Sequence, residues 1–118
     1  MKVKARKYVH DRLFDDSEHR GLSAGDVYDV VGLDDANFRV IDDDDQPFLY
    51  SKGLFDVVDP AVPADWITIT AHDVSYIDPP ECAERGFYED YFDGVQTAVR
   101  TFDAFRKRSS IGYKLKSR

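Results

Sequence analysis

The sequence has a single cysteine and no long apolar run. Cys82 cannot form an internal disulfide, which favours a reducing compartment and predicts a cytoplasmic protein. No apolar stretch approaches the roughly 20 residues that a membrane-spanning helix needs. No apolar segment follows the basic N-terminus, as it would in a signal peptide. We therefore expect no membrane partner.

Catalytic and metal-binding motifs are also missing. The chain has no glycine-rich phosphate loop, no GxSxG nucleophile motif and no zinc-protease motif. Its three histidines lie far apart, and Cys82 has no second cysteine at ligand spacing. The aspartate run at residues 42–45 lacks the glycine and the glutamate that a calcium loop requires at its sixth and twelfth positions. We predict no enzyme activity, no catalytic residue, no cofactor and no metal.

Negative charge dominates the middle of the chain. The net charge of the whole chain is −7, but residues 21–94 hold eighteen acidic and three basic residues, a net charge of −15, between two basic ends. A body of this sign repels nucleic acid and attracts basic proteins. The charge pattern therefore predicts a basic protein as partner and no nucleic acid.

Short strand patterns separated by turns fill the first half of the chain. Alternating or β-branched residues predict strands at residues 2–9, 27–31, 38–41, 48–50 and 55–58. Gly, Asp and Asn between them predict turns. Residues 11–23 are polar, which is typical of a long loop, and residues 51–54 predict one 3₁₀ turn.

The second half predicts a hairpin and a helix. Residues 66–70 alternate large apolar residues with threonine, and a tight turn leads into a second strand at 74–77. Residues 87–92 form a short aromatic and acidic segment. The apolar period then changes to 3.6, which predicts an amphipathic helix at 95–107. Its apolar stripe consists of Val95, Ala98, Val99, Phe102 and Phe105. Residues 111–115 form either an edge strand or a loose tail.

The order of these parts resembles an SH3-like small barrel. Residues 22–31 are similar to the segment in which SH3 domains leave their long first loop and enter the second strand, and residues 48–58 look like the fourth strand, the 3₁₀ turn and the closing strand. The resemblance implies an SH3-like barrel at residues 1–60. Together with the β-hairpin and the C-terminal amphipathic helix that the pattern of residues 61–118 predicts, we expect an α+β fold in one domain over residues 1–118.

The peptide groove of that family is incomplete in this chain. SH3 domains that bind proline-rich peptides carry a tryptophan at the start of the third strand and a proline in the 3₁₀ turn, where this sequence has Phe38 and Ser51. Residues 76–94 and the helix after them loosely resemble bacterial immunity proteins, small acidic partners of toxins. That resemblance implies an inhibitor that occludes the active site of a basic toxin.

The leading hypothesis is an acidic protein-binding module of the immunity or antitoxin type. In such an interface aromatic rings supply buried area, and carboxylates meet Lys or Arg of the partner. The predicted partner-binding residues lie in two acidic turns and in the aromatic and acidic segment. They are Asp34, Asp35, Asp42, Asp43, Asp44, Asp45, Tyr88, Glu89, Asp90, Tyr91 and Asp93.

Three alternatives stay open from the sequence. Carboxylates standing in for phosphates would make the chain a mimic of nucleic acid, from a phage or mobile element. An enzyme would use Cys82 or the Glu89–Asp90 pair in a deep pocket, although a small buried apolar role is the commoner one for such a cysteine. A generic SH3-like interaction domain would share the features of the leading hypothesis.

Overall fold

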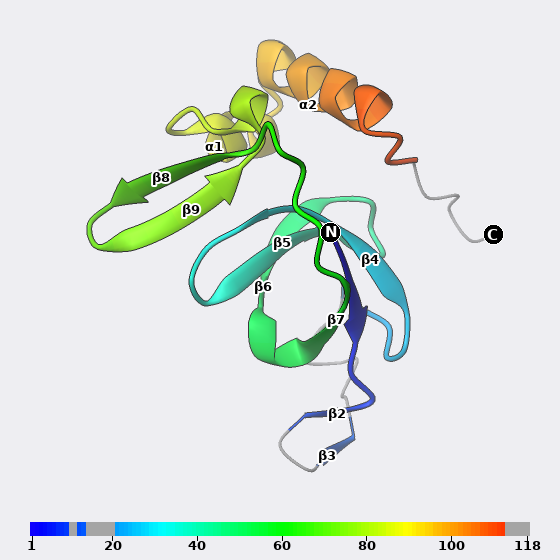
Figure 1. Ribbon diagram of the computed structural model, residues 1–118. Helices are drawn as coiled ribbons and strands as arrows, with labels where there is room; N and C mark the ends of the chain where they lie inside the picture. The colour runs from blue at the N-terminus through cyan, green and yellow to red at the C-terminus, as the bar shows by residue number, and fades with distance from the viewer. Residues whose placement is uncertain (10–11, 14–20, 113–118) are drawn as a thin grey trace, which may run out of the picture.

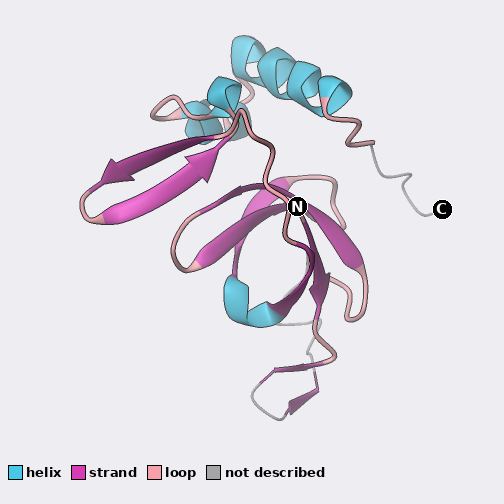
Figure 2. Cartoon of the chain, in the orientation of Figure 1, coloured by secondary structure: helices cyan, strands magenta, loops and turns pink. Residues whose placement is uncertain are grey.

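An antiparallel sheet and a C-terminal helix make up the fold. The computed structural model describes residues 1–9, 12–13 and 21–112. The strands are β1 Lys2–Ala5, β2 Tyr8–Val9, β3 Arg12–Leu13, β4 Val27–Leu33, β5 Asn37–Ile41, β6 Pro47–Ser51, β7 Phe55–Asp59, β8 Ile67–Ala71 and β9 Val74–Asp78. The helices are η1 Lys52–Leu54, η2 Pro80–Cys82, α1 Phe87–Phe92 and α2 Gln96–Arg108. The hairpin β8–β9 projects to the left of the curved sheet, and α2 lies above the sheet at the top right of the view (Figures 1 and 2).

The main sheet is curved but open. Its strands follow the order β6-β5-β4-β1-β7, and β9 joins β4 and carries β8. Among the described strands β6 and β7 lie at opposite ends of this path, so the sheet does not close on itself. The predicted α+β class, with a hairpin and a C-terminal helix after the sheet, is confirmed.

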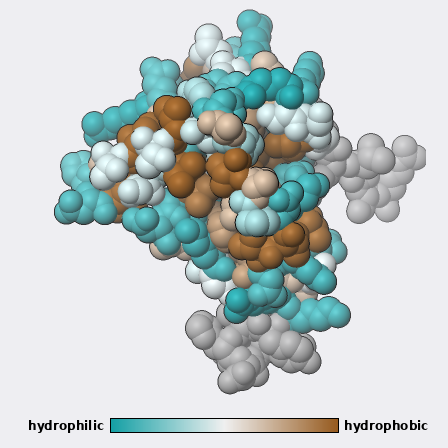
Figure 3. All heavy atoms as spheres, viewed as in Figure 1, coloured by the Kyte–Doolittle hydropathy of each residue, from teal (hydrophilic) through white to brown (hydrophobic). Residues whose placement is uncertain are grey.

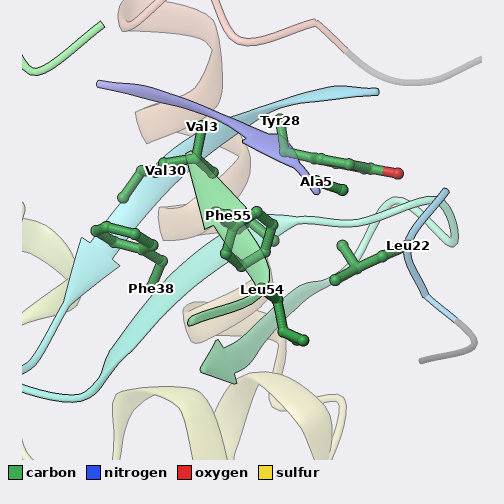
Figure 4. Packing of buried hydrophobic residues seen from close by; sticks show 9 residues of the cluster. Val3, Ala5, Leu22, Tyr28, Val30, Phe38, Leu54 and Phe55 are labelled. Carbon is green, nitrogen blue, oxygen red and sulfur yellow. The ribbon is translucent and has the colours of Figure 1, made fainter. Parts of the chain in front are cut away.

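Two hydrophobic cores lie on opposite faces of β4 and β5. Adjacent residues of a strand point to opposite faces, so Val30 and Val40 face one core while Val31 and Ile41 face the other. The inner core is built from Val3, Ala5, Leu22, Tyr28, Val30, Phe38, Val40, Leu54 and Phe55, whose side chains converge between the strands (Figure 4). The outer core consists of Val31, Ile41, Cys82, Phe87, Ala98, Phe102 and Phe105.

Helix α2 closes the outer core through the predicted apolar stripe. Ala98, Phe102 and Phe105 are buried, as their 3.6-residue spacing predicts. Val95 precedes the helix as its N-cap and is 41% exposed, so the stripe is shorter than predicted. Of the helices in the described ranges, none combines the length and apolar character needed to cross a membrane.

Arg106 is the unexpected member of the last turn of α2. The cationic end of the helix predicts solvent-facing side chains that complement the helix dipole, yet the Arg106 side chain is only 1% exposed. Its guanidinium donates hydrogen bonds to Asp45 Oδ1 at 2.8 Å and to the carbonyl of Gly112 at 2.6 Å. Arg106 thus ties α2 to the turn between β5 and β6.

Element boundaries differ from the sequence pattern mainly at the two ends of the chain. The strand predicted at residues 2–9 ends at Ala5, and β2 then pairs with β3 as a separate ribbon. Part of the loop predicted at residues 11–23 is therefore strand. Ile111 and Gly112 are not in a strand, and the rest of the tail predicted at 111–115 lies outside the described residues.

Candidate functional site

The acidic turn between β5 and β6 is partly folded inward. The Asp42 side chain is fully buried. It accepts hydrogen bonds from the Tyr50 hydroxyl at 2.8 Å and from the amides of Asp44 and Gln46 at 3.0 and 3.1 Å. Burial raises the pKa of Asp42, and these hydrogen bonds oppose the shift. Three donors therefore hold the Asp42 carboxylate inside the turn, out of reach of a partner.

The other aspartates of this turn differ in their contacts and in their exposure to solvent. Asp43 accepts hydrogen bonds from the Tyr28 hydroxyl at 2.7 Å and from Ser23 Oγ at 2.8 Å. Asp45 forms the ion pair with Arg106. Asp43 and Asp44 are exposed, while Asp45 is half-buried. Only Asp43 and Asp44 of this turn are therefore exposed to a partner, and Asp43 is also held by internal hydrogen bonds.

The acidic turn between β4 and β5 binds its own backbone and the hairpin. Asp34 accepts hydrogen bonds from the amides of Ala36 at 2.9 Å and Asn37 at 2.7 Å, which closes a local turn. Asp35 Oδ2 accepts the amide of Ser75 on β9 at 3.4 Å. The predicted partner-binding role of these two residues is not tested by the contacts, which explain why aspartate suits both positions.

In the aromatic and acidic segment that contains α1, the tyrosine rings pack against α2, whereas the acidic side chains are exposed. The Tyr91 ring lies 5.1 Å from that of Phe102 and the Tyr88 ring lies 6.1 Å from it, so both tyrosines dock α1 on α2. Glu89, Asp90 and Asp93 are exposed. The carboxylates of this segment, rather than its tyrosines, are therefore available to a partner.

A stacked pair of phenylalanines joins α1 to β6 at the surface. The rings of Phe48 and Phe92 are nearly parallel, with centroids 4.9 Å apart, and each residue is 42% exposed. Neither was among the residues predicted from the sequence. A signal was present, because Phe48 and Leu49 are adjacent apolar residues in a strand whose two sides cannot both face one core. Phe48, Phe92, Glu89, Asp90 and Asp93 together form what we call the aromatic-acidic face.

A cleft of about 480 Å³ lies beside this face, between the hairpin, the sheet and the segment that leads from η2 into α1. Its apolar lining includes Leu33, Leu49, Ile69, Ala71, Tyr76 and Phe87. Its charged lining consists of the carboxylates Asp34, Asp78, Glu84 and Glu89 and the guanidinium groups of Arg39 and Arg85. Hydrophobic residues gather among hydrophilic ones on the side of the molecule that carries the hairpin (Figure 3).

Arg39 and Tyr88 form the polar floor of the cleft. The Arg39 guanidinium carbon lies 3.8 Å from the centre of the Tyr88 ring, and its Nη1 donates to the carbonyl of Pro47 at 2.7 Å. The Tyr88 hydroxyl is buried and interacts with the Cys82 thiol, and burial raises the pKa of Tyr88 well above its ordinary value. Burial raises the pKa of Cys82, beneath them, to about 12. Cys82 is therefore a protonated, buried thiol, unsuited to nucleophilic attack at neutral pH.

Asp78 is a cleft carboxylate whose pKa is strongly shifted. Burial raises the pKa of Asp78 to about 6, and the charge of Arg39 opposes the shift. The backbone makes room for this carboxylate at Gly32, where a β-carbon would collide with Asp78 Oδ1. The site thus holds a carboxylate whose charge is costly in the folded state.

Replacing Asp78 by asparagine is expected to raise the free energy of unfolding at pH 7 by about 1–2 kcal/mol, allowing for partial solvent screening. The folded-state pKa of about 6 lies above the ordinary value of 3.8. Between these values the folded form keeps a proton that the unfolded form loses, so stability from this group falls as pH rises. Urea denaturation of both proteins at pH 4 and pH 7 should show the difference at pH 7 and less than about 1 kcal/mol at pH 4.

The exposed turn residue Asp73 provides the control for this measurement. Asp73→Asn removes the same charge from the neighbouring loop and should change stability by less than about 0.5 kcal/mol at either pH. An Asp78→Asn protein that gains nothing at pH 7 would contradict the prediction.

Neither metal-ligand clusters in the described residues nor similarity to known proteins indicates a function for this site. Within the described residues no group of three or more His, Cys, Asp or Glu side chains could hold a metal ion. Compared with known proteins, the chain matches no family model, no curated protein and no solved structure.

Proposed function

We propose that the chain is an acidic protein-binding module that covers a basic partner, as an immunity or antitoxin protein covers its toxin. The observation that carries the proposal is the stacked Phe48–Phe92 pair, in which each residue is 42% exposed and Phe92 belongs to a segment with three exposed acids. In the toxin case, covering occludes the active site of the partner. The protein itself performs no reaction in this proposal.

The aromatic-acidic face has the composition of a steered interface. Aromatic side chains at the centre of an interface supply most of the binding energy when they are desolvated. The carboxylates of Glu89, Asp90 and Asp93 are exposed within three residues of Phe92 along the chain and would raise the association rate of a basic partner. The cleft beside the face adds carboxylates of the same sign.

The assignment of residues 1–60 to an SH3-like barrel is part of the same proposal. The strand order β6-β5-β4-β1-β7 and the 3₁₀ helix η1 between β6 and β7 support an SH3-like barrel at residues 1–60. Ser51, which stands at the proline position of peptide-binding SH3 domains, accepts the amide of Gly53 at 3.3 Å and caps η1. The single reduced cysteine, Cys82, supports a cytoplasmic location.

A mimic of nucleic acid has less support than a protein-binding module. Such a mimic needs rows of free carboxylates, yet Asp42 is buried and Asp45 is held by Arg106. Exposed stacked rings are not a property of a phosphate backbone. Protein binding accounts for both the rings and the acids.

Reversing three charges on the aromatic-acidic face is expected to abolish capture of the partner. The variant carries Glu89→Lys, Asp90→Lys and Asp93→Lys, all at exposed positions. Immobilised protein would be incubated with an extract of the source cells at low and moderate salt. Wild-type protein should retain a basic protein most strongly at low salt, because the Debye length shrinks from about 30 Å at 0.01 M to about 10 Å at 0.1 M. The variant should retain at least about tenfold less of the partner than wild-type protein.

A matched variant controls for net charge. Asp26→Lys, Asp56→Lys and Asp59→Lys change the charge by the same amount at exposed positions outside the aromatic-acidic face, and the Arg6–Asp56 ion pair that is lost is itself exposed and contributes little stability. This protein should keep most of its binding. Equal retention of the partner by the α1 variant and by wild-type protein would overturn the proposed face.

A further inference from the structure

Strand β8 is an unprotected edge of the sheet. Among the described strands it pairs only with β9, and no other strand covers its outer side. Its residues Ile67, Thr68, Ile69, Thr70 and Ala71 contain no charge and no proline. Natural proteins normally protect such an edge with lysine, proline, a bulge or a covering segment, because it templates pairing with another chain.

The backbone groups that point outward can be identified from the contacts of β9. Thr70 pairs with Ser75 across the hairpin. The Ser75 amide donates to Asp35 on the side away from β8, so this pair does not exchange backbone hydrogen bonds. The hydroxyls of Thr70 and Ser75 lie 3.4 Å apart, as expected for the closer, non-hydrogen-bonded kind of pair. Hydrogen-bonded and non-hydrogen-bonded pairs alternate along the hairpin, so Thr68 belongs to the same kind of pair as Thr70. The amides and carbonyls of both threonines therefore point away from β9.

One face of this edge opens into the cleft. Ile69 and Ala71 of β8 line it together with Tyr76 and Asp78 of β9. A strand added beside β8 would continue this face, and every second side chain would point toward the cleft. The cleft lining carries four carboxylates against two guanidinium groups, which favours cationic side chains at those positions.

We propose that an extended segment of the basic partner adds to β8 as a further strand. Its backbone bonds to the outward groups of Thr68 and Thr70, and alternate Lys or Arg side chains reach the cleft carboxylates. This strand addition rests on the proposed function and specifies how the partner is held. Backbone pairing provides affinity in such complexes, and alternate side-chain sites provide specificity.

A second copy of the chain fits the edge less well. Each copy carries a net charge of −7, so two copies repel. In the antiparallel register that pairs the whole of β8 with itself, Asp65 of one copy would lie opposite Asp73 of the other. Like charges directly opposite each other destabilise a strand pair.

Proline at position 70 tests the proposal. Thr70→Pro removes an outward amide and leaves the β8–β9 ladder intact, since proline is tolerated on edge strands when its nitrogen faces solvent. Thr70→Ala keeps the amide and removes the same hydroxyl. The probe is a capped peptide of about seven residues that alternates lysine and valine, long enough for an average strand. We expect Thr70→Pro to weaken its Kd at low salt by about tenfold or more, and Thr70→Ala to leave it within about twofold.

Two further measurements separate backbone pairing from charge. A peptide of the same sequence, N-methylated at alternate residues on the side that would face β8, keeps every charge but should bind at least about tenfold more weakly to wild-type protein. Amide exchange at Thr68 and Thr70 should slow when the unmodified peptide is added. The amide shifts of Tyr76 report whether the hairpin stays folded in Thr70→Pro.

The outcomes distinguish failure of strand addition at β8 from failure of the proposed protein-binding function. Equal binding of both peptides, or equal binding to both Thr70 variants, would overturn strand addition and leave the aromatic-acidic face as the binding surface. Failure of the unmodified peptide to bind at low salt would also overturn strand addition. Protection of Thr68 and Thr70 without peptide, growing with protein concentration, would assign the edge to a second copy instead. The proposed function fails only if partner capture ignores the charge reversal on α1.

Discussion

Arg106→Ala is expected to lower the free energy of unfolding by about 3 kcal/mol, because removing one partner of a buried ion pair leaves the other charge poorly compensated. The Arg106 side chain is 1% exposed, and it binds both Asp45 and the carbonyl of Gly112. The substitution therefore removes a charge pair, a backbone contact and buried aliphatic area at once. The melting temperature should fall by about 10 °C or more.

The exposed Arg100 on the same helix provides the control. Arg100→Ala should cost no more than about 0.5 kcal/mol. A double-mutant cycle with Asp45→Ala should return a coupling energy of at least about 1 kcal/mol between positions 106 and 45. Equal stability losses at positions 100 and 106 would show that the buried ion pair does not hold α2 in place.

Phe102→Ala is expected to cost about 3–5 kcal/mol, the range for truncating a fully buried aromatic side chain. Phe102 is 0% exposed, and its ring meets those of Tyr88, Tyr91 and Phe105 at centroid distances of 6.1, 5.1 and 5.8 Å. Its loss leaves a cavity between α1 and α2. Denaturant titration measures the cost, and amide exchange should quicken first in α1, which depends on Phe102 for its attachment.

Phe102→Leu separates the cavity from the loss of the ring. Leucine keeps most of the apolar volume, so this variant should lose less than half as much stability as Phe102→Ala. If both variants lost the same amount, the ring contacts rather than the filled volume would govern the attachment of α1.

Most strands and helices could be predicted from the sequence, because each depends on a pattern of residues that are close together in the chain. The 3.6-residue period after Val95 reflects the buried side of α2. The alternation at residues 66–70 predicted strand β8 correctly, although its isoleucines are exposed or half-buried. The acidic 42–45 run was placed correctly as a turn between strands. Composition could not show that Asp42 turns inward, because its donor Tyr50 comes from the following strand.

The candidate site depends on contacts between distant parts of the chain. Phe48 and Phe92 meet only because α1 folds back onto β6. Arg39, Asp78 and Tyr88 come from three separate elements, and no spacing in the sequence links them. The sequence did indicate the acids of α1, since a short helix with its aromatic residues inward leaves Glu89, Asp90 and Asp93 in solvent.

Because β4 and β5 contribute to both hydrophobic cores, the first half of the chain is not a separable unit. A fragment ending near residue 60 would keep its inner core but would expose Val31 and Ile41, which α2 and its neighbours cover in the whole chain. Bare apolar strips on a sheet promote self-association. The chain is therefore expected to unfold as one cooperative block, and a fragment of residues 1–60 used as a binding reagent would precipitate or form oligomers.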